Sequence, residues 1–410
     1  MSRLGPSFRR LVSSATVSGL GDGVRIAALP LLAAALTASP TTIAAVTLAG
    51  GLPWALFALI SGALVDRWDR RRVMALSDAA RFVVTAVLVT LVATHHSSIA
   101  AILVVAFLLG TAETFFDNAS QAILPSIVND KLLERANGRL YAAQIVTIQF
   151  VGPPLGALLF GWGMALPFGF DSASFGLSAI LLIGMTVTRH PRPNATVPAG
   201  HEDRSTASQL RAEIAEGLRW LWAHRPLRTL AITLGLFNFT GTAMESILVL
   251  FALHTLHIGR FGYGLLFTTY AVGGLLGTVV AERIGRRVPT RLLVLLIIIV
   301  CAASEIVMGA VPNRWVAGAM YALQGLGSVV WNIVTVSLRQ RIIPSELLGR
   351  VNSVYRAIAW GTMPLGALVG GFIARWFGLQ APFIFAGAAM IVVGVVSYPS
   401  LAGLSPPDPA

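Results

Sequence analysis

Long apolar stretches, separated by short polar ones, most limit what this chain can fold into. Apolar runs of about 18 residues or more recur along the whole sequence, and each can cross ~30 Å of hydrocarbon as a helix. Only 12% of the 410 residues are charged and 55% are hydrophobic. A soluble domain has about 25% charged residues. The sequence therefore predicts an all-α polytopic membrane protein.

The apolar runs predict twelve membrane-spanning helices in two sets of six. The N-terminal set is expected at roughly 11–37, 41–65, 73–94, 98–124, 139–163 and 167–187. The C-terminal set is expected at roughly 228–253, 261–281, 291–311, 315–338, 351–374 and 380–400. The longest polar stretch, 188–227, separates two predicted six-helix bundles at 1–187 and 228–410. Its second part, Gln209 to Ala223, predicts an amphipathic helix on the membrane surface, acting as a plain linker or as a regulatory contact.

The basic residues are distributed unequally between the two sides of this predicted topology. A net charge of +12 would also fit a protein that binds nucleic acid. However, 24 of the 30 basic residues fall in six stretches that alternate on one side, and only Arg260, Arg314 and Arg375 fall in the opposite loops. Cytoplasmic loops carry such an excess. We therefore expect no nucleic-acid partner, a location in the cytoplasmic membrane among its lipids, and two cytoplasmic termini.

Sequence motifs repeat between the two halves. The segment Gly62-x-x-x-Asp66-Arg67-x-Asp69-Arg70-Arg71 lies between the second and third predicted spans, and Glu282-Arg283-x-Gly285-Arg286-Arg287 follows 216 positions after its charged part. Arg135-x-Asn137 matches Arg350-x-Asn352, and the pentapeptide at 154–158 recurs at 364–368. Three matches in the same order at nearly one offset indicate two related halves.

The Gly62–Arg71 segment resembles the best-known signature of the major facilitator superfamily. Val151–Gly156 resembles the Gly-Pro signature of the superfamily's antiporters, and Gly21-Asp22-Gly23 and Glu216-Gly217-Leu218-Arg219 resemble enterobactin exporters and macrolide and tetracycline efflux pumps. The resemblance implies two pseudo-symmetric six-helix bundles with the substrate path between them. Asp69 stands where the family usually has glycine at a tight turn, and we expect it to tolerate a left-handed backbone there.

The energy source is constrained by what the chain lacks. Lys131 is the single lysine, and no Gly-x-x-x-x-Gly-Lys phosphate loop surrounds it. Cys301 is the single cysteine, and the seven histidines form no ligand motif for a metal. We therefore expect no cofactor and no enzymatic activity, which leaves an ion gradient or passive transport.

Ionisable side chains inside predicted spans are candidate functional groups, because charge in lipid is costly. Asp22 lies near the midplane with Arg25 at i+3, and the pair either couples to protons or substrate or is simply self-neutralising. Glu113 and Asp117 lie one turn apart and repel each other, which favours proton binding; a static pairing with Arg25 or Arg81 is the alternative.

By the resemblance, spans one, four, seven and ten line the central cavity, so these acids and Glu245 would converge there. We interpret Asp78 with Arg81, and Glu305, as structural. Arg356 is expected to act either as a packing partner within the bundle or as an anchor for the substrate. We expect Asn238, Trp331 and Asn332 to line the substrate cavity.

Two segments are candidates for moving parts. Asp66 would pair with an arginine across the seam between the halves and latch one conformation, or else the arginines only anchor the chain at the membrane surface. Gly152, Pro153 and Pro154 would kink the fifth span, with close helix packing through Gly156 as the alternative.

Together these patterns predict a proton-coupled secondary transporter that exports an amphipathic small molecule and works as a monomer. An importer or facilitator on the same fold remains open, as does a lipid translocator or receptor.

Overall fold

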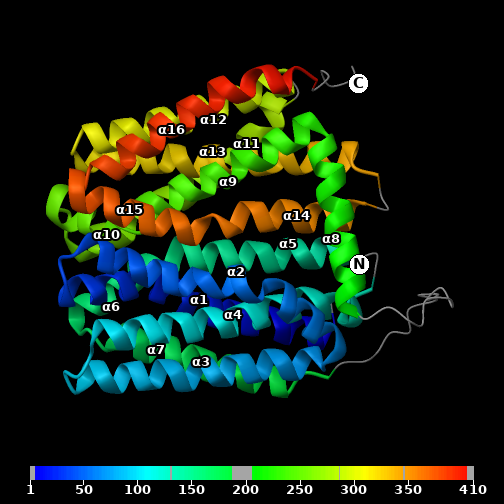
Figure 1. The fold of residues 1–410 in the computed structure, drawn as a ribbon. Coiled ribbons are helices and arrows are strands. Elements are labelled where there is room, and N and C mark those ends of the chain that lie inside the picture. Colours follow the sequence, from blue (N-terminus) through cyan, green and yellow to red (C-terminus); the bar gives the residue numbers. More distant parts are fainter. Residues whose placement is uncertain (1–4, 130–131, 187–205, 286, 345–346, 404–410) are drawn as a thin grey trace.

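The computed structural model describes residues 5–129, 132–186, 206–285, 287–344 and 347–403, which are almost entirely helical (Figure 1). Within this part, eleven helices are long and apolar enough to cross a membrane. A bent pair, Arg225–Glu245 and Leu248–Thr255 with 43° between them, supplies a twelfth. The prediction of twelve spans is confirmed.

The N-terminal bundle contains six spans. They are α1 (Pro6–Leu36), α2 (Pro40–Arg67), α3 (Arg70–Ala93), α4 (Ile99–Ile127), a composite fifth span and α7 (Leu166–Ile183). The composite span runs through α5 (Leu133–Gln144), the π-helix η2 (Ile145–Val151) and α6 (Gly152–Trp162). The predicted bounds agree with these helices to within six residues, with the largest differences at the starts of the first and fifth spans.

The C-terminal bundle has the same number of spans. They are α9 (Arg225–Glu245) with α10 (Leu248–Leu250) and η3 (Phe251–Thr255), then α11 (Gly259–Gly285), α12 (Thr290–Ala310), α13 (Arg314–Ile342), α14 (Leu348–Gly361) with α15 (Met363–Phe377), and α16 (Ala381–Ser397). A short 3-10 helix, η4 (Tyr398–Gly403), follows.

Polar side chains at the connections define where several spans begin. Ser98 accepts a hydrogen bond from the backbone N–H of Ala101 at the start of α4, and Asn313 accepts one from Trp315 at the start of α13. Asp69 does the same for α3, with Oδ1 3.0 Å from the N atom of Arg71. Its φ of −67° is ordinary extended backbone, so the expected left-handed turn is wrong. Asp69 fits because a capping carboxylate satisfies free N–H groups.

The predicted amphipathic helix is α8 (Thr206–Ala223), which crosses one end of the molecule (Figure 1). We call this the arginine-rich end, because the α2–α3 and α11–α12 connections also lie there. Glu216 of α8 pairs with Arg350 of α14 at 2.5 Å, and Leu221 is buried in the core of the C-terminal bundle. The described part of the linker is therefore attached to the C-terminal bundle; residues 187–205, with the predicted boundary at 188, lie outside the described part.

The two bundles meet along two seams, where α2 packs along α15 and α11 packs along η2 and α6. Glycines make both seams tight. A Cβ added at Gly371 would lie 2.6 Å from Cβ of Ala44, and one at Gly264 would lie 2.7 Å from the carbonyl oxygen of Pro153. Both glycines lie toward the end opposite the arginine-rich end.

The buried apolar side chains show how the bundles are joined. One cluster includes residues of both bundles, such as Leu32, Phe160, Phe251 and Phe383, and lies in the half of the molecule away from the arginine-rich end. In the arginine-rich half, the clusters of described residues are separate, one in each bundle. The molecule is thus closed at one end and divided at the other.

Candidate functional site

Seven ionisable side chains from four helices gather inside the N-terminal bundle. They are Asp22 and Arg25 of α1, Asp78 and Arg81 of α3, Glu113 and Asp117 of α4, and Asp171 of α7. All but Asp117 take part in the ion pairs described below. We call this set the charged cluster.

Arg25 holds one side of the charged cluster. Its Nη2 atom lies 2.6 Å from Oδ1 of Asp22 and 3.2 Å from Oε2 of Glu113. Its Nε atom lies 3.7 Å from Oδ2 of Asp171. The predicted neutralisation of Asp22 by Arg25 is therefore present, and so is the pairing of Glu113 with arginine.

Arg81 is almost fully buried and holds the other side. Its Nη1 atom lies 3.5 Å from both Asp22 and Asp78, and its Nη2 atom lies 3.9 Å from Glu113. The guanidinium also lies 5.3 Å from the ring centre of Phe116 and 5.0 Å from that of Phe175. Aromatic faces attract the planar, weakly hydrated guanidinium and so hold it in place where water is excluded. Arg81 is thus shared between acids of three helices, α1, α3 and α4.

Asp171 was missed from the sequence, although its side chain is completely buried. Two turns further along the same helix, Ser178 donates to Asp78 and lies 2.6 Å from the hydroxyl of Ser14. The signal that would have found Asp171 is an acid inside an apolar span, the criterion that selected Asp22. Its pairing with Arg25, 146 positions away on another helix, cannot be predicted from the spacing of residues within one helix.

The charged cluster contains more acids than bases. Five carboxyl groups share two arginines, so full ionisation would leave an excess of three negative charges. A low-dielectric interior holds such an excess only with bound protons or additional cations. Full ionisation of all five carboxyl groups is therefore costly at this position.

Glycines on α1 bring its backbone close to its neighbours. A Cβ at Gly21 would lie 2.5 Å from Oδ1 of Asp171, and one at Gly23 would lie 2.9 Å from Cα of Gly152. One at Gly156 would lie 2.9 Å from Cα of Val24. The glycines on either side of Asp22 thus let α1 approach α7 at Gly21 and the fifth span at Gly23, where a side chain would not fit.

A π-helix lies in the fifth span at the place where the sequence predicts a kink. The α-helical hydrogen bonds change to π spacing over Ile145–Val151, and α6 begins at Gly152 with Pro153 in its first turn. Proline lacks an N–H group and so starts a helix easily. The alternative, close packing at Gly152 and Gly156, is also present, because both glycines contact α1.

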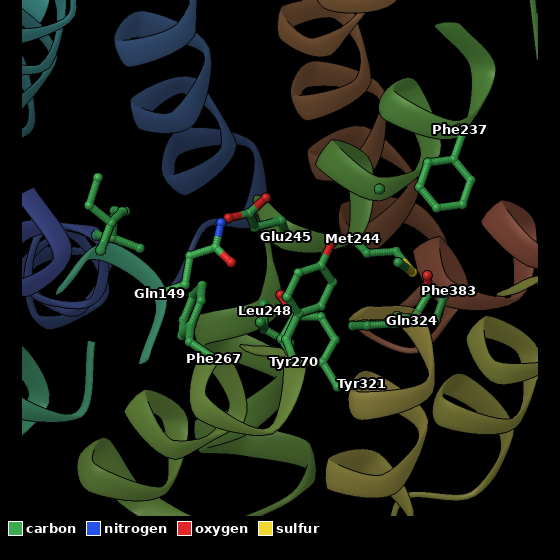
Figure 2. A pocket seen from close by; sticks show the side chains of 13 residues that line it. Gln149, Phe237, Met244, Glu245, Leu248, Phe267, Tyr270, Tyr321, Gln324 and Phe383 are labelled. Carbon is green, nitrogen blue, oxygen red and sulfur yellow. The ribbon is translucent and has the colours of Figure 1, made fainter. Parts of the chain in front are cut away.

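A cavity of about 280 Å³ lies between the bundles, mostly within the C-terminal one. Figure 2 shows Glu245 of α9 at its wall, near Gln149 on one side and the rings of Tyr270 and Tyr321 on the other. Ile26 of α1 also lines it. Glu245 is not an ion-pair partner in the charged cluster, so the expected convergence of all the acids is wrong. The arginines account for the difference, since Arg25 and Arg81 hold their acids inside the N-terminal bundle.

Three residues expected in the substrate cavity are placed elsewhere. Trp331 is only 2% exposed and stacks parallel to Phe237 with their centres 6.4 Å apart, so it belongs to the core. Asn238 donates to the carbonyl oxygen of Ala359 at 2.7 Å and joins α9 to α14. Asn332 is exposed but is not among the lining residues of the cavity around Glu245.

Arg356 and Asp117 differ in their surroundings. The Arg356 guanidinium lies 4.6 Å from the centre of the Trp360 ring, which meets Trp54 of α2 edge-on at 5.0 Å. This favours a packing role at a seam between the bundles. Asp117 lines a separate hollow between α4 and α5 together with Asn137 and other polar residues.

The arginines after α2 hold the N-terminal bundle together. Arg70 donates to the carbonyl oxygen of Ala122 at 2.9 Å, and Arg71 donates to that of Met185 at 2.8 Å. The predicted latch rests on the side chain of Asp66, which lies outside the described part, as does Arg286.

The related segment in the C-terminal half lies at the end of α11. The side chains of Glu282, Arg283 and Arg287 surround a polar hollow there. Gly62 and Arg67 lie in the last two turns of α2, where a Cβ added at Gly62 would meet no atom within 4 Å. The glycine is therefore not required by packing in this conformation.

Residues 4–402 match the family described as "Transmembrane secretion effector", a branch of the major facilitator superfamily. The chain belongs to the major facilitator superfamily. The architecture that the sequence motifs implied is thereby confirmed, with twelve spans in two six-helix bundles.

Two relatives of this superfamily member are efflux proteins. The multidrug efflux pump Tap of Mycobacterium tuberculosis is 29% identical over 413 residues, covering 97% of this chain and 93% of that protein. Macrolide efflux protein A of Streptococcus pyogenes is 24% identical over 364 residues, covering 88% and 87%. The sequence-based resemblance to efflux proteins is confirmed.

Solved structures of other transporters share the fold. A bacterial homologue of the iron transporter ferroportin in an inward-facing state superposes with a TM-score of 0.76 at 17% identity, covering 98% of this chain and all of that one. A bacterial homologue of the lysosomal transporter Spinster, inward-facing and occupied, gives 0.74 at 14% identity, covering 96% and 95%. Among the described residues here, no group of three or more His, Cys, Asp or Glu is arranged to hold a metal ion.

Proposed function

We propose that this superfamily member is a proton-coupled secondary transporter that exports amphipathic small molecules across the cytoplasmic membrane. The arginine-rich end, with both termini, faces the cytoplasm, as the distribution of basic residues indicates. The divided apolar core at that end then corresponds to an inward-facing conformation. Export is supported by the kinship with efflux proteins.

The charged cluster carries the proposal of proton coupling. Protonation of Asp22, Glu113 or Asp117 from outside removes negative charge beside Arg25 and Arg81, so the arginines change partners. We propose that this exchange favours the return to the inward-facing state. Release of the proton to the cytoplasm restores the pairing of Arg25 with Asp22 and readies the transporter for substrate. A proton gradient is the proposed energy source, and the monomer is the proposed working unit.

The test is efflux of ethidium from proteoliposomes with an imposed pH gradient. Asp22→Asn removes the titratable group but keeps its shape, and we expect gradient-driven transport to fall about tenfold or more, as the loss of a charge-assisted hydrogen bond predicts. Glu305→Gln is the matched control, because Glu305 is 1% exposed on α12, in the other bundle. Unchanged gradient dependence in Asp22→Asn would contradict the proposal.

A further inference from the structure

The cavity around Glu245 combines one carboxylate with several aromatic rings. Tyr270 and Tyr321 have ring centres 5.2 Å apart, and Phe267 meets Tyr321 edge-on at 6.3 Å. All three rings line the cavity. Aromatic faces attract cations within about 6 Å of the ring centre. The rings therefore form a surface that suits a positively charged, weakly hydrated group.

Glu245 has no protein partner for its charge among the described residues. Among these residues no ion pair or hydrogen bond reaches its carboxylate, and its side chain is exposed into the cavity. None of the described residues that line the cavity is basic. Arg25, which precedes the lining residue Ile26, is already paired with Asp22 and Glu113. A carboxylate at this depth in a membrane protein normally has a cationic partner or a function.

We infer that this cavity binds the cationic group of a monovalent, lipophilic organic cation, with its charge on Glu245 and its body against Tyr270, Tyr321 and Phe267. Gln149 supplies a further polar contact from the N-terminal bundle, whereas the Gln324 amide at the opposite wall already donates to the carbonyl oxygen of Cys301. The remaining walls, including Ile148 and Leu248, are apolar and fit an aliphatic or aromatic body. The inference names the substrate class of the proposed exporter and rests on that function only for the direction of transport.

The test measures binding to purified protein in detergent, without any gradient. Tetraphenylphosphonium and tetraphenylborate have nearly the same shape and opposite charges, so their affinities compare charge alone. We expect the wild type to bind the phosphonium about 10- to 100-fold more tightly than the borate, as one carboxylate in a partly desolvated site predicts. Equal affinities would overturn the inference.

Variants assign that preference to the cavity. Glu245→Gln is expected to lose the preference while still binding tetraphenylborate, which shows that the variant is folded. Glu216→Gln makes the same chemical change at the arginine-rich end, where the carboxylate pairs with Arg350 far from the cavity, and is expected to keep the preference. Tyr321→Leu should weaken phosphonium binding several-fold, and Tyr321→Phe should retain it because the ring remains.

The outcomes separate this inference from the proposed function. If Glu245→Gln keeps the charge preference, or Glu216→Gln removes it, the cationic site is not at Glu245. If Asp22→Asn still responds to the pH gradient while Glu245→Gln loses phosphonium binding, proton coupling through Asp22 is wrong and the site assignment stands.

Discussion

The closed end of the molecule depends on two glycines, and adding a methyl group to them should open it. Gly371 of α15 faces Ala44 and Thr41 of α2, where an added Cβ would lie 2.6 Å from the nearest side-chain atom and 3.0 Å from the nearest Cα. Gly264 of α11 faces Pro153 and Ala157 of α6, with an added Cβ at 2.7 and 2.8 Å. Carbon atoms prefer separations of about 3.5–4.0 Å. Either substitution therefore pushes the bundles apart by several tenths of an ångström or more.

The size of the effect follows from the cost of overpacking. Extra methyl groups in a well-packed contact cost about 1–3 kcal/mol each. Because the two glycines lie on different seams, their effects should add, to about 2–6 kcal/mol for the double variant. Each 1.4 kcal/mol changes an equilibrium about tenfold. Because opening of the closed end would relieve this strain, the equilibrium of the Gly264→Ala, Gly371→Ala double variant should shift from the proposed inward-facing state to the outward-facing state by at least about 25-fold.

Distances between spin labels report this shift. Labels at Glu134→Cys on α5 and Ser353→Cys on α14, both exposed near the arginine-rich end, are placed in a Cys301→Ala background. The double glycine variant should show shorter distances between the labels than the wild type, because closure at this end accompanies opening at the other.

Two other glycines provide the matched control for the spin-label experiment. Gly161 of α6 and Gly361 of α14 have no atom within 4 Å of an added Cβ. The double variant Gly161→Ala, Gly361→Ala should therefore keep the wild-type distances. If the Gly264, Gly371 double variant is monodisperse and has the wild-type distribution, the close contacts do not hold the end shut.

Two further predictions concern stability. Glu216→Gln should lower the melting temperature only slightly, because its ion pair with Arg350 is at the surface and worth about 0–1 kcal/mol. Gly217→Val should lower the melting temperature more, because an added Cβ lies 2.8 Å from the Arg350 carbonyl oxygen. The reverse order of the two variants in thermal unfolding would refute this. Arg81→Met should cost about 3–5 kcal/mol by leaving buried acids unpaired, and adding Asp78→Asn should restore part of the yield of monodisperse protein; no rescue would argue against their pairing.

The fold was largely predictable because its determinants are local. Apolar length fixes the spans, and proline and capping residues fix many of their starts, as Ser98 and Asn313 do. The form of the α2–α3 turn was not predictable from the family pattern, because Asp69 satisfies the turn by capping rather than by a left-handed backbone.

The charged cluster was only partly predictable. The pairs Asp22 with Arg25 and Asp78 with Arg81 follow from spacing, since i and i+3 share a helix face. Asp171 joins them through packing of α7 on α1, which no spacing within one helix reveals. Trp331 was misplaced because its helix carries apolar residues on several sides, so the sequence does not show which face meets the cavity.

Helix α1 is the common boundary of the charged cluster and the cavity around Glu245. Arg25 and Ile26 are consecutive, and one points to the acids while the other lines the cavity. At Gly23 the backbone of α1 packs directly against the backbone of Gly152, so no side chain lies between them that could rearrange if α1 rotated. A small turn of this helix would alter both neighbourhoods at once, so proton occupancy and cargo occupancy would each change the affinity for the other by the same factor.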